Sequence, residues 1–242
     1  MRSFLPLICL TFGLVLSFNG LLPAQMNLFN VPSGEIIEGG DIFYQQNLIV
    51  SKNLKLNTTL NYGLGKGWEA GINLLDLNIN TRPGKQIIPF DSDQPSQNPD
   101  FCINFQKSFE LLPVLHLSAG IRTGIHSLQG NKELGVVNYN YINSQFTIPG
   151  STFRFVFGGY YMNPSYGAND HAFGLQTGID VPVIREKLSV TSDFISGKND
   201  WGTFTGGISV LLGQDWKFSI GGQLPNPGSR NNPGINLQIN KK

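Results

Sequence analysis

The sequence predicts an all-β fold, a single antiparallel up-and-down transmembrane β-barrel of about 12 strands, and three observations carry this prediction. The chain of 242 residues begins with an export signal. The rest repeats segments of roughly ten residues in which apolar and polar side chains alternate. Charged residues make up only 14% of the chain, whereas soluble domains carry roughly 25%.

The N-terminus has the parts of a secretory signal peptide. A positive end and the apolar run of residues 4–22 lead to Ala24, a small residue suited to cleavage. We therefore predict a signal peptide over residues 1–24, an N-terminal periplasmic lead-in over 25–40 and an outer-membrane barrel over 41–242. The alternative is a retained N-terminal membrane anchor.

Strict alternation is clearest over residues 54–64, where leucines and Tyr62 share one parity and polar residues share the other. Side chains of a strand alternate between its two faces, so this segment has an apolar face and a polar face. The pattern recurs around residues 68–74, 101–106, 115–122, 137–141, 153–158, 173–181, 188–194, 203–212, 216–221 and 235–240. A first strand near 41–50, with poorer alternation, brings the total to about twelve.

We expect the apolar parity of every segment to face lipid, including Val137, Tyr139 and Tyr141. At Leu74 and Leu75 the apolar residues change phase, which predicts a β-bulge. Because side chains of the polar parity are mostly Asn, Gln, Ser, Thr and Gly, they suit a crowded wet lumen better than a soluble surface, which is usually rich in charge. A soluble exported barrel is the alternative.

The connections also differ between the two predicted ends. Those assigned to the periplasm are short, and most of those assigned to the outside are longer, as in bacterial membrane barrels. Aromatic residues at strand ends predict an interface girdle that consists of Tyr62, Trp68, Trp201 and Trp216. The barrel must close by pairing its first and last strands, because unpaired peptide groups are costly in hydrocarbon.

Two stretches resemble a known group of proteins. The hairpin Leu60–Gly65 followed by Trp68–Leu74, and the final stretch Asn226–Ile239, are similar to hairpins of an outer-membrane barrel family named after the phenol meta-degradation pathway. The resemblance implies a barrel that passes small or apolar molecules, and it brings no site residues. The chain departs from typical outer-membrane barrels at its end, Ile239–Lys242, which lacks a terminal aromatic residue.

Charged residues on the polar parity are the candidate site. We predict that they line the lumen, either as a path for solutes or as a mixed-sign network that stiffens the barrel. The set consists of Lys55, Glu69, His116, Arg122, Arg154, Asp180, Asp193 and Lys217.

Other chemistry has little support in the sequence. His116 and Ser118 lie two apart, as in an outer-membrane phospholipase, but both share the inward parity, so a lipid-acting enzyme is not favoured. Asp91, Asp93, Asn98 and Asp100 could offer oxygens to a hard cation, but their spacing fits no metal-binding loop. Cys102 is left alone once the signal is cleaved, and no cofactor motif appears.

The predicted function is therefore that of an outer-membrane channel or transporter for small solutes. A non-transporting structural or surface-contact barrel is the alternative. The expected partners are outer-membrane lipid, the barrel-assembly machinery and a small-molecule solute. A net charge of +1 with no basic run gives no reason to expect nucleic acid.

Overall fold

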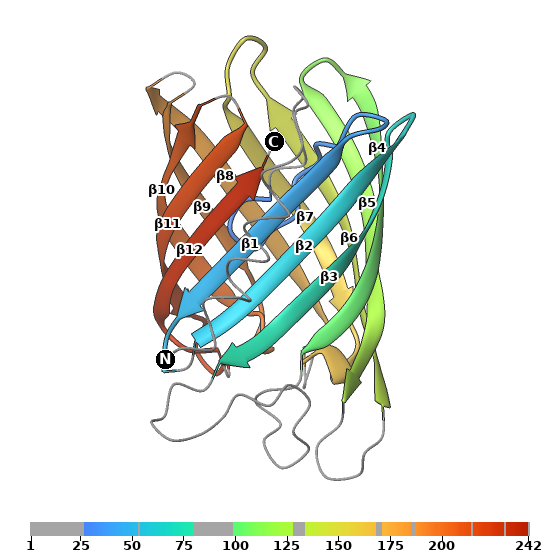
Figure 1. The fold of residues 1–242 in the computed structure, drawn as a ribbon, viewed down its shortest axis with the longest axis vertical. Coiled ribbons are helices and arrows are strands. Elements are labelled where there is room, and N and C mark those ends of the chain that lie inside the picture. Colours follow the sequence, from blue (N-terminus) through green and yellow to red (C-terminus); the bar gives the residue numbers. More distant parts are fainter. Residues whose placement is uncertain are drawn as a thin grey trace, which may run out of the picture.

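Twelve antiparallel strands form one closed barrel in the computed structural model (Figure 1). The described residues are 27–52, 54–79, 99–127, 134–167, 171–184, 187–213, 215–229 and 231–241. The strands are β1 (Ile42–Val50), β2 (Leu54–Gly65), β3 (Trp68–Ile79), β4 (Asp100–Leu112), β5 (Leu115–Ser127), β6 (Leu134–Thr147), β7 (Arg154–Met162), β8 (Phe173–Ile184), β9 (Leu188–Ile195), β10 (Thr203–Leu212), β11 (Trp216–Pro225) and β12 (Gly234–Lys241).

Each strand pairs with the next along the chain, and β1 closes the barrel on β12, in register from Tyr44 opposite Lys241 to Val50 opposite Ile235. The predicted fold class, strand number and closure are confirmed. A 3-10 helix, Pro164–Tyr166, follows β7. Within the described ranges, no helix is long and apolar enough to cross a membrane.

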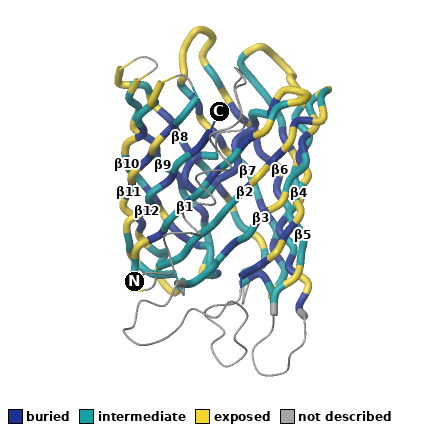
Figure 2. The backbone as a smooth tube through the Cα atoms, viewed as in Figure 1, coloured by how far each residue is buried: buried dark blue, intermediate teal, exposed yellow. Residues whose placement is uncertain are grey.

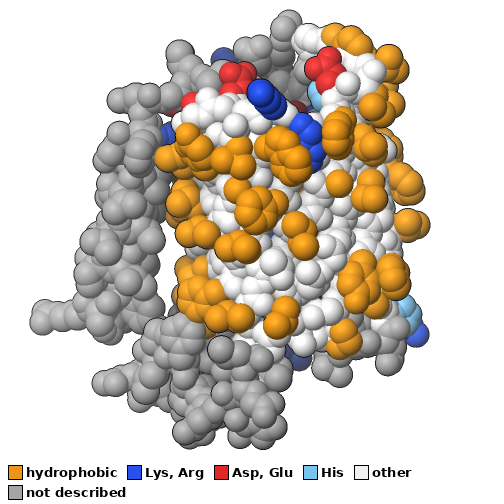
Figure 3. All heavy atoms as spheres, turned by 90° about the vertical axis from the view of Figure 1, so that its right-hand side faces the viewer, with side chains coloured by type: hydrophobic (Ala, Val, Ile, Leu, Met, Phe, Trp, Pro, Cys, Tyr) orange, Lys and Arg blue, Asp and Glu red, His pale blue; other side chains and the backbone are white. Residues whose placement is uncertain are grey.

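The two faces of the wall have the polarity expected in a membrane. In β2, Leu60, Tyr62 and Leu64 are exposed, while Thr59 and Asn61 are buried. Hydrophobic side chains cover the outer face formed by β3 to β5, and most of the charged groups visible on that face lie near its rims (Figure 3). The interior, by contrast, holds buried amides and hydroxyls. Buried and exposed positions alternate along many of the strands (Figure 2). A soluble barrel has the reverse arrangement.

Part of β6 corrects the prediction for the apolar parity. Val137, Tyr139 and Tyr141 point into the barrel and are buried. They pack in an interior cluster, and the Tyr139 hydroxyl donates to Gln176 Oε1 at 2.5 Å. A tyrosine ring can be buried in a polar interior when its hydroxyl finds a partner there, so apolarity alone assigned these residues to the wrong face.

The predicted bulge in β3 is confirmed. Leu56 pairs with Leu77 but Thr58 pairs with Leu74, so β3 carries one extra residue at this point. Leu75 becomes buried, and Asp76 adopts a φ of 54°. The N–H of Asp76 donates to the side-chain oxygen of Asn57 at 2.7 Å, which replaces the lost ladder bond.

Two rims of the barrel are used as landmarks below. The turn rim carries the start of β1, the end of β12 and the short connections that include Lys66–Gly67 and Pro113–Val114. The loop rim carries the ends of β1, β3 and the other odd-numbered strands and the starts of the even-numbered ones, at the lower end of the barrel in Figure 1. The assignment of the turn rim to the periplasm stays a prediction.

The outward face can be tested with a charge in the middle of a strand. Ile208 lies near the middle of β10 and is 45% exposed, whereas Leu212, 52% exposed, ends the same strand at the turn rim. Ile208→Lys should lower the free energy of unfolding in phospholipid bilayers by about 2–4 kcal/mol, and Leu212→Lys by about 0–1 kcal/mol. Equal costs for the two variants would contradict a membrane-embedded wall.

Candidate functional site: the filled lumen

An irregular stretch of chain occupies the interior of the barrel. Residues 27–40, here called the inner segment, precede β1 and contact inward side chains from strands all around the wall. Leu28, Phe29, Val31 and Ile37 of this segment are almost completely buried. The segment was predicted as part of a periplasmic lead-in, and its place in the lumen was not foreseen.

Side chains of the wall accept hydrogen bonds from the backbone of the inner segment. The Asp193 carboxylate accepts from the N–H groups of Asn30 and Val31, the latter at 2.9 Å. Gln145 Oε1 accepts from Gly34 N–H at 2.7 Å. These contacts satisfy peptide groups that have no strand to pair with.

Carbonyl groups of the inner segment are matched in the same way. Asn143 donates to Pro32 at 2.8 Å, Gln106 to Ser33 at 2.9 Å, Ser108 to Gly34 at 2.8 Å and Gln238 to Leu28 at 3.0 Å. An amide side chain offers both a donor and an acceptor, so it can bind either group of a peptide backbone. The abundance of inward Asn and Gln is explained by this role.

Three wall glycines provide the space for the inner segment. A Cβ at Gly63 would lie 1.9 Å from the Glu38 carbonyl oxygen, and one at Gly178 would lie 2.0 Å from Leu28. At Gly221 a Cβ would lie 2.7 Å from the Phe29 ring. A larger residue at any of these positions would push the segment away from the wall.

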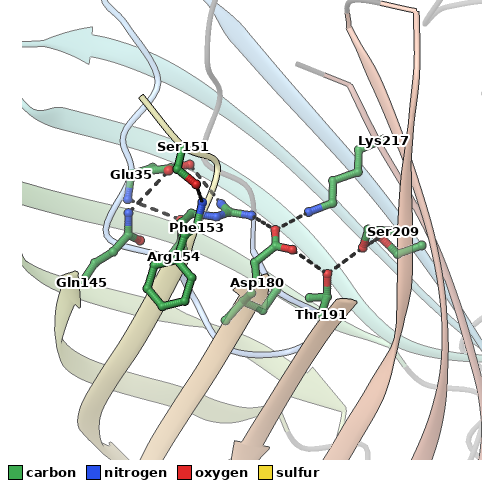
Figure 4. A network of polar contacts seen from close by, with 12 residues as sticks. Glu35, Gln145, Ser151, Phe153, Arg154, Asp180, Thr191, Ser209 and Lys217 are labelled. Carbon is green, nitrogen blue, oxygen red and sulfur yellow. Dashed lines mark hydrogen bonds and ion pairs between the residues drawn. The ribbon is translucent and has the colours of Figure 1, made fainter. Parts of the chain in front are cut away.

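A cluster of four charged residues lies toward the turn rim (Figure 4). Asp180 accepts from Arg154 at 2.6 Å and from Lys217 at 2.7 Å. Arg154 also donates to Glu35 of the inner segment at 3.0 Å. The three wall residues are buried, and all four line a cavity of about 220 Å³. We call these residues the turn-rim cluster.

A second group of polar contacts lies toward the loop rim. Lys55 pairs with Asp76 at 3.1 Å, and His126 Nδ1 lies 2.7 Å from Asp100. Both pairs are near the ends of β2 to β5. They link neighbouring strands at the rim where the longer connections emerge.

Arg122, which also belongs to the predicted charged set, lies among tyrosines. Its guanidinium donates to the Tyr166 hydroxyl at 3.2 Å and lies 5.9 Å from the centre of the Tyr139 ring. Tyr166 follows β7 in the 3-10 helix, and burial raises the pKa of its hydroxyl above the usual value. The hydroxyl is therefore neutral at physiological pH and can accept the hydrogen bond from Arg122.

The structure brings together only part of the predicted charged set. Arg154, Asp180 and Lys217 meet in one cluster, and Glu69 and Asp193 each bind the inner segment instead. Lys55 and Arg122 lie apart, as described above. His116 is half-buried, and it pairs with Glu110 of β4 and with Gln145 of β6 on the two neighbouring strands.

The other residues considered from the sequence are Ser118, beside His116, and the loop aspartates. Ser118 is fully buried, and its hydroxyl is directed to the Asn143 carbonyl oxygen at 3.4 Å. Asp91, Asp93 and Asn98 lie outside the described residues. Within the described part of the chain, no group of three or more His, Cys, Asp or Glu side chains could hold a metal ion.

The predicted girdle residues differ in their surroundings. Tyr62 and Trp68 are exposed on the outer face next to the turn between β2 and β3, and Trp216 is half-buried at the start of β11. Trp201 lies elsewhere, because its indole stacks on Tyr166 at 5.0 Å and donates to the Tyr166 carbonyl oxygen at 3.0 Å. Its ring therefore packs against the interior cluster.

Sequence reasoning missed Glu35 and the backbone of the inner segment. Arg154, Asp180 and Lys217 belong to strands, where parity predicts the face on which a side chain lies. Glu35 belongs to a stretch without alternation, and its partner Arg154 is 119 residues away in the sequence. No local signal connects the two.

A closed barrel with an apolar outside, a polar inside and its own N-terminal residues in the lumen defines a membrane-type β-barrel with a filled interior. Among solved structures, the chain is similar to the Acinetobacter baumannii outer membrane protein Omp33, with 13% identity and a TM-score of 0.46. The alignment covers 84% of this chain and 98% of that one. No family model and no curated protein matches the sequence.

The role of Asp193 in holding the inner segment can be tested by thiol labelling. Asp193→Ala leaves two buried N–H groups without an acceptor, at a cost of about 1–3 kcal/mol each, so the segment should leave the wall more often. A Ser33→Cys reporter in a Cys102→Ser background should then react faster with a thiol reagent. Asp100→Ala, whose carboxylate contacts His126 instead, is the control. Equal rates in both variants would contradict this role.

Proposed function

We propose that this protein is an outer-membrane barrel whose lumen is a path for small solutes, closed at rest by the inner segment. The observation that carries the proposal is that residues 27–40 lie in the lumen and make polar contacts with a polar wall. The predicted signal peptide and the apolar exterior support a location in the outer membrane.

The size of the barrel supports a path through it. Eight strands enclose an interior that side chains alone can fill, whereas barrels of 16 to 18 strands leave an aqueous channel. Twelve strands lie between these cases, so the wall encloses more space than its own side chains fill. Residues 27–40 occupy that space, and water could occupy it if they left.

The nature of the solute follows from the wall. The resemblance to the phenol meta-degradation family implies small or apolar molecules. The inward amides, hydroxyls and ion pairs favour a polar solute over an apolar one, because an apolar molecule would leave these groups without partners. A lipid-acting enzyme is not favoured, because Ser118 faces the interior.

A non-transporting barrel with a structural or surface-contact role is the second candidate. It is favoured by the extent of the contacts between the inner segment and the wall, which include four almost completely buried apolar side chains. In this case the inner segment would be a permanent filling that stiffens the barrel. The two functions differ in whether the segment ever leaves.

A disulfide between the inner segment and the wall separates these candidates. A Cβ built on Gly34 lies 2.9 Å from the Cβ of Gln145, near enough for a disulfide after a small adjustment. In a Cys102→Ser background, the Gly34→Cys/Gln145→Cys protein should conduct in planar bilayers under applied voltage when reduced, and be silent when oxidised.

The single variant Gly34→Cys controls for the effects of oxidant and reductant, and its conductance should not change with either. Silence of the wild-type protein and of the reduced double variant would contradict the pore and support the non-transporting barrel. Equal conductance in the oxidised and reduced double variant would show that the inner segment is not the gate.

A further inference from the structure

The wall of the turn-rim cluster carries more positive than negative charge. Arg154 and Lys217 are both buried and share the single carboxylate of Asp180, at 2.6 and 2.7 Å. Thr191 donates to the other oxygen of that carboxylate at 2.9 Å. Two cations and one anion thus come from strands β7, β8 and β11, and the excess is one positive charge.

The inner segment supplies the balancing charge. Glu35 lies 3.0 Å from Arg154, on the side of the guanidinium away from Asp180, and Gln145 donates to its other oxygen at 3.4 Å (Figure 4). Its side chain is 32% exposed, against 4% for Arg154. The cations are therefore fixed in the wall, while this carboxylate belongs to the part that can move.

The space around Glu35 is large enough for a small molecule. The cavity of about 220 Å³ is lined by Thr147, Ser151, Ser189 and Ser209 as well as by the charged residues, and by apolar residues such as Phe153 and Leu188. A dry cavity of about 150 Å³ in another protein admits benzene. This one has room for a small carboxylate together with some water.

From these observations we infer that the cavity is a binding site for a small carboxylate anion, and that Glu35 occupies the position of this anion while the inner segment is in place. Arg154 donates from Nη2 to Asp180 and from Nη1 to Glu35, and the second contact is one that any carboxylate can take. If Glu35 leaves, the buried excess positive charge has to be compensated, and an incoming carboxylate can do so with the same contacts.

This inference rests on the proposed function, since it requires the inner segment to move, and it names the class of solute. A solute carboxylate and Glu35 compete for Arg154, so binding of the solute favours the displaced segment. The coupling is reciprocal. The factor by which bound solute shifts the segment toward the displaced state is also the factor by which displacement of the segment raises the affinity for the solute. Glu35 is in this sense a tethered competitor for the site.

Rescue of a truncated side chain by acetate tests the site without measuring transport. Glu35→Ala should lower the thermal unfolding midpoint of the full chain in detergent. Sodium acetate at about ten times its dissociation constant should then raise the midpoint by about 3–6 °C more than the same concentration of sodium chloride. Glu38→Ala is the matched control, because Glu38 is an exposed carboxylate of the same segment.

The wild type and Glu38→Ala should respond equally to acetate and chloride, and Glu35→Ala/Arg154→Gln should lose the extra response to acetate. If Glu35→Ala responds to acetate no more than to chloride, the site is refuted. Binding to exposed lysines outside the cavity, such as Lys66, would raise the midpoint of all variants alike, which also refutes it.

Conductance separates this inference from the proposed pore. In bilayers with a potassium chloride gradient, Glu35→Gln should shift the reversal potential toward chloride selectivity, and Glu38→Gln should not. Acetate rescue without conductance in any variant would refute the pore and keep the anion site. Conductance with unchanged selectivity and no acetate rescue would refute the anion site and keep the pore.

Discussion

Peptide groups inside a membrane must pair with one another, and the rest of this structure depends on that constraint. An unpaired group in hydrocarbon costs several kcal/mol, so the sheet has to close, here between β1 and β12. Closure at twelve strands fixes the width of the lumen. The interior is then too wide for the wall side chains to fill, and the inner segment occupies the remaining space.

Peptide groups inside the lumen also need hydrogen-bond partners. The inner segment is not part of the sheet, so its N–H and C=O groups need side-chain partners. Asp193 and Gln145 accept from its N–H groups, while Asn143 and Gln106 donate to its carbonyls. This explains why the chain is rich in uncharged polar residues and poor in charge, because an amide can satisfy a backbone without a counterion.

Sequence alone was sufficient for the wall, because backbone geometry imposes a period of two on each strand. The phase change at Leu74 and Leu75 predicted the bulge for the same reason. Periodicity was misleading at Tyr139, where hydrophobicity could not distinguish a lipid-facing ring from a ring whose hydroxyl reaches Gln176. The alternation of apolar and polar residues gives no information about residues 27–40, because this segment does not alternate.

In the candidate site, only the residues that belong to strands could be predicted from the sequence. Parity placed Arg154 and Asp180 on the inner face, and the strand register sets them directly opposite each other. The position of Glu35 depends on how an irregular segment threads through the closed barrel. That path is decided by contacts between residues more than a hundred positions apart, such as those of Gly34 with Gln145 and of Val31 with Asp193.

The contacts of the inner segment also determine how it would act as the proposed gate. Water can replace its hydrogen bonds to the wall at a net cost of about 0.5–1.5 kcal/mol each. The burial of Leu28, Phe29, Val31 and Ile37 is not replaced in this way, and each such side chain contributes about 1.5–3 kcal/mol. The closed arrangement is therefore favoured at rest, and a solute that binds where Glu35 binds has to offset only part of this preference.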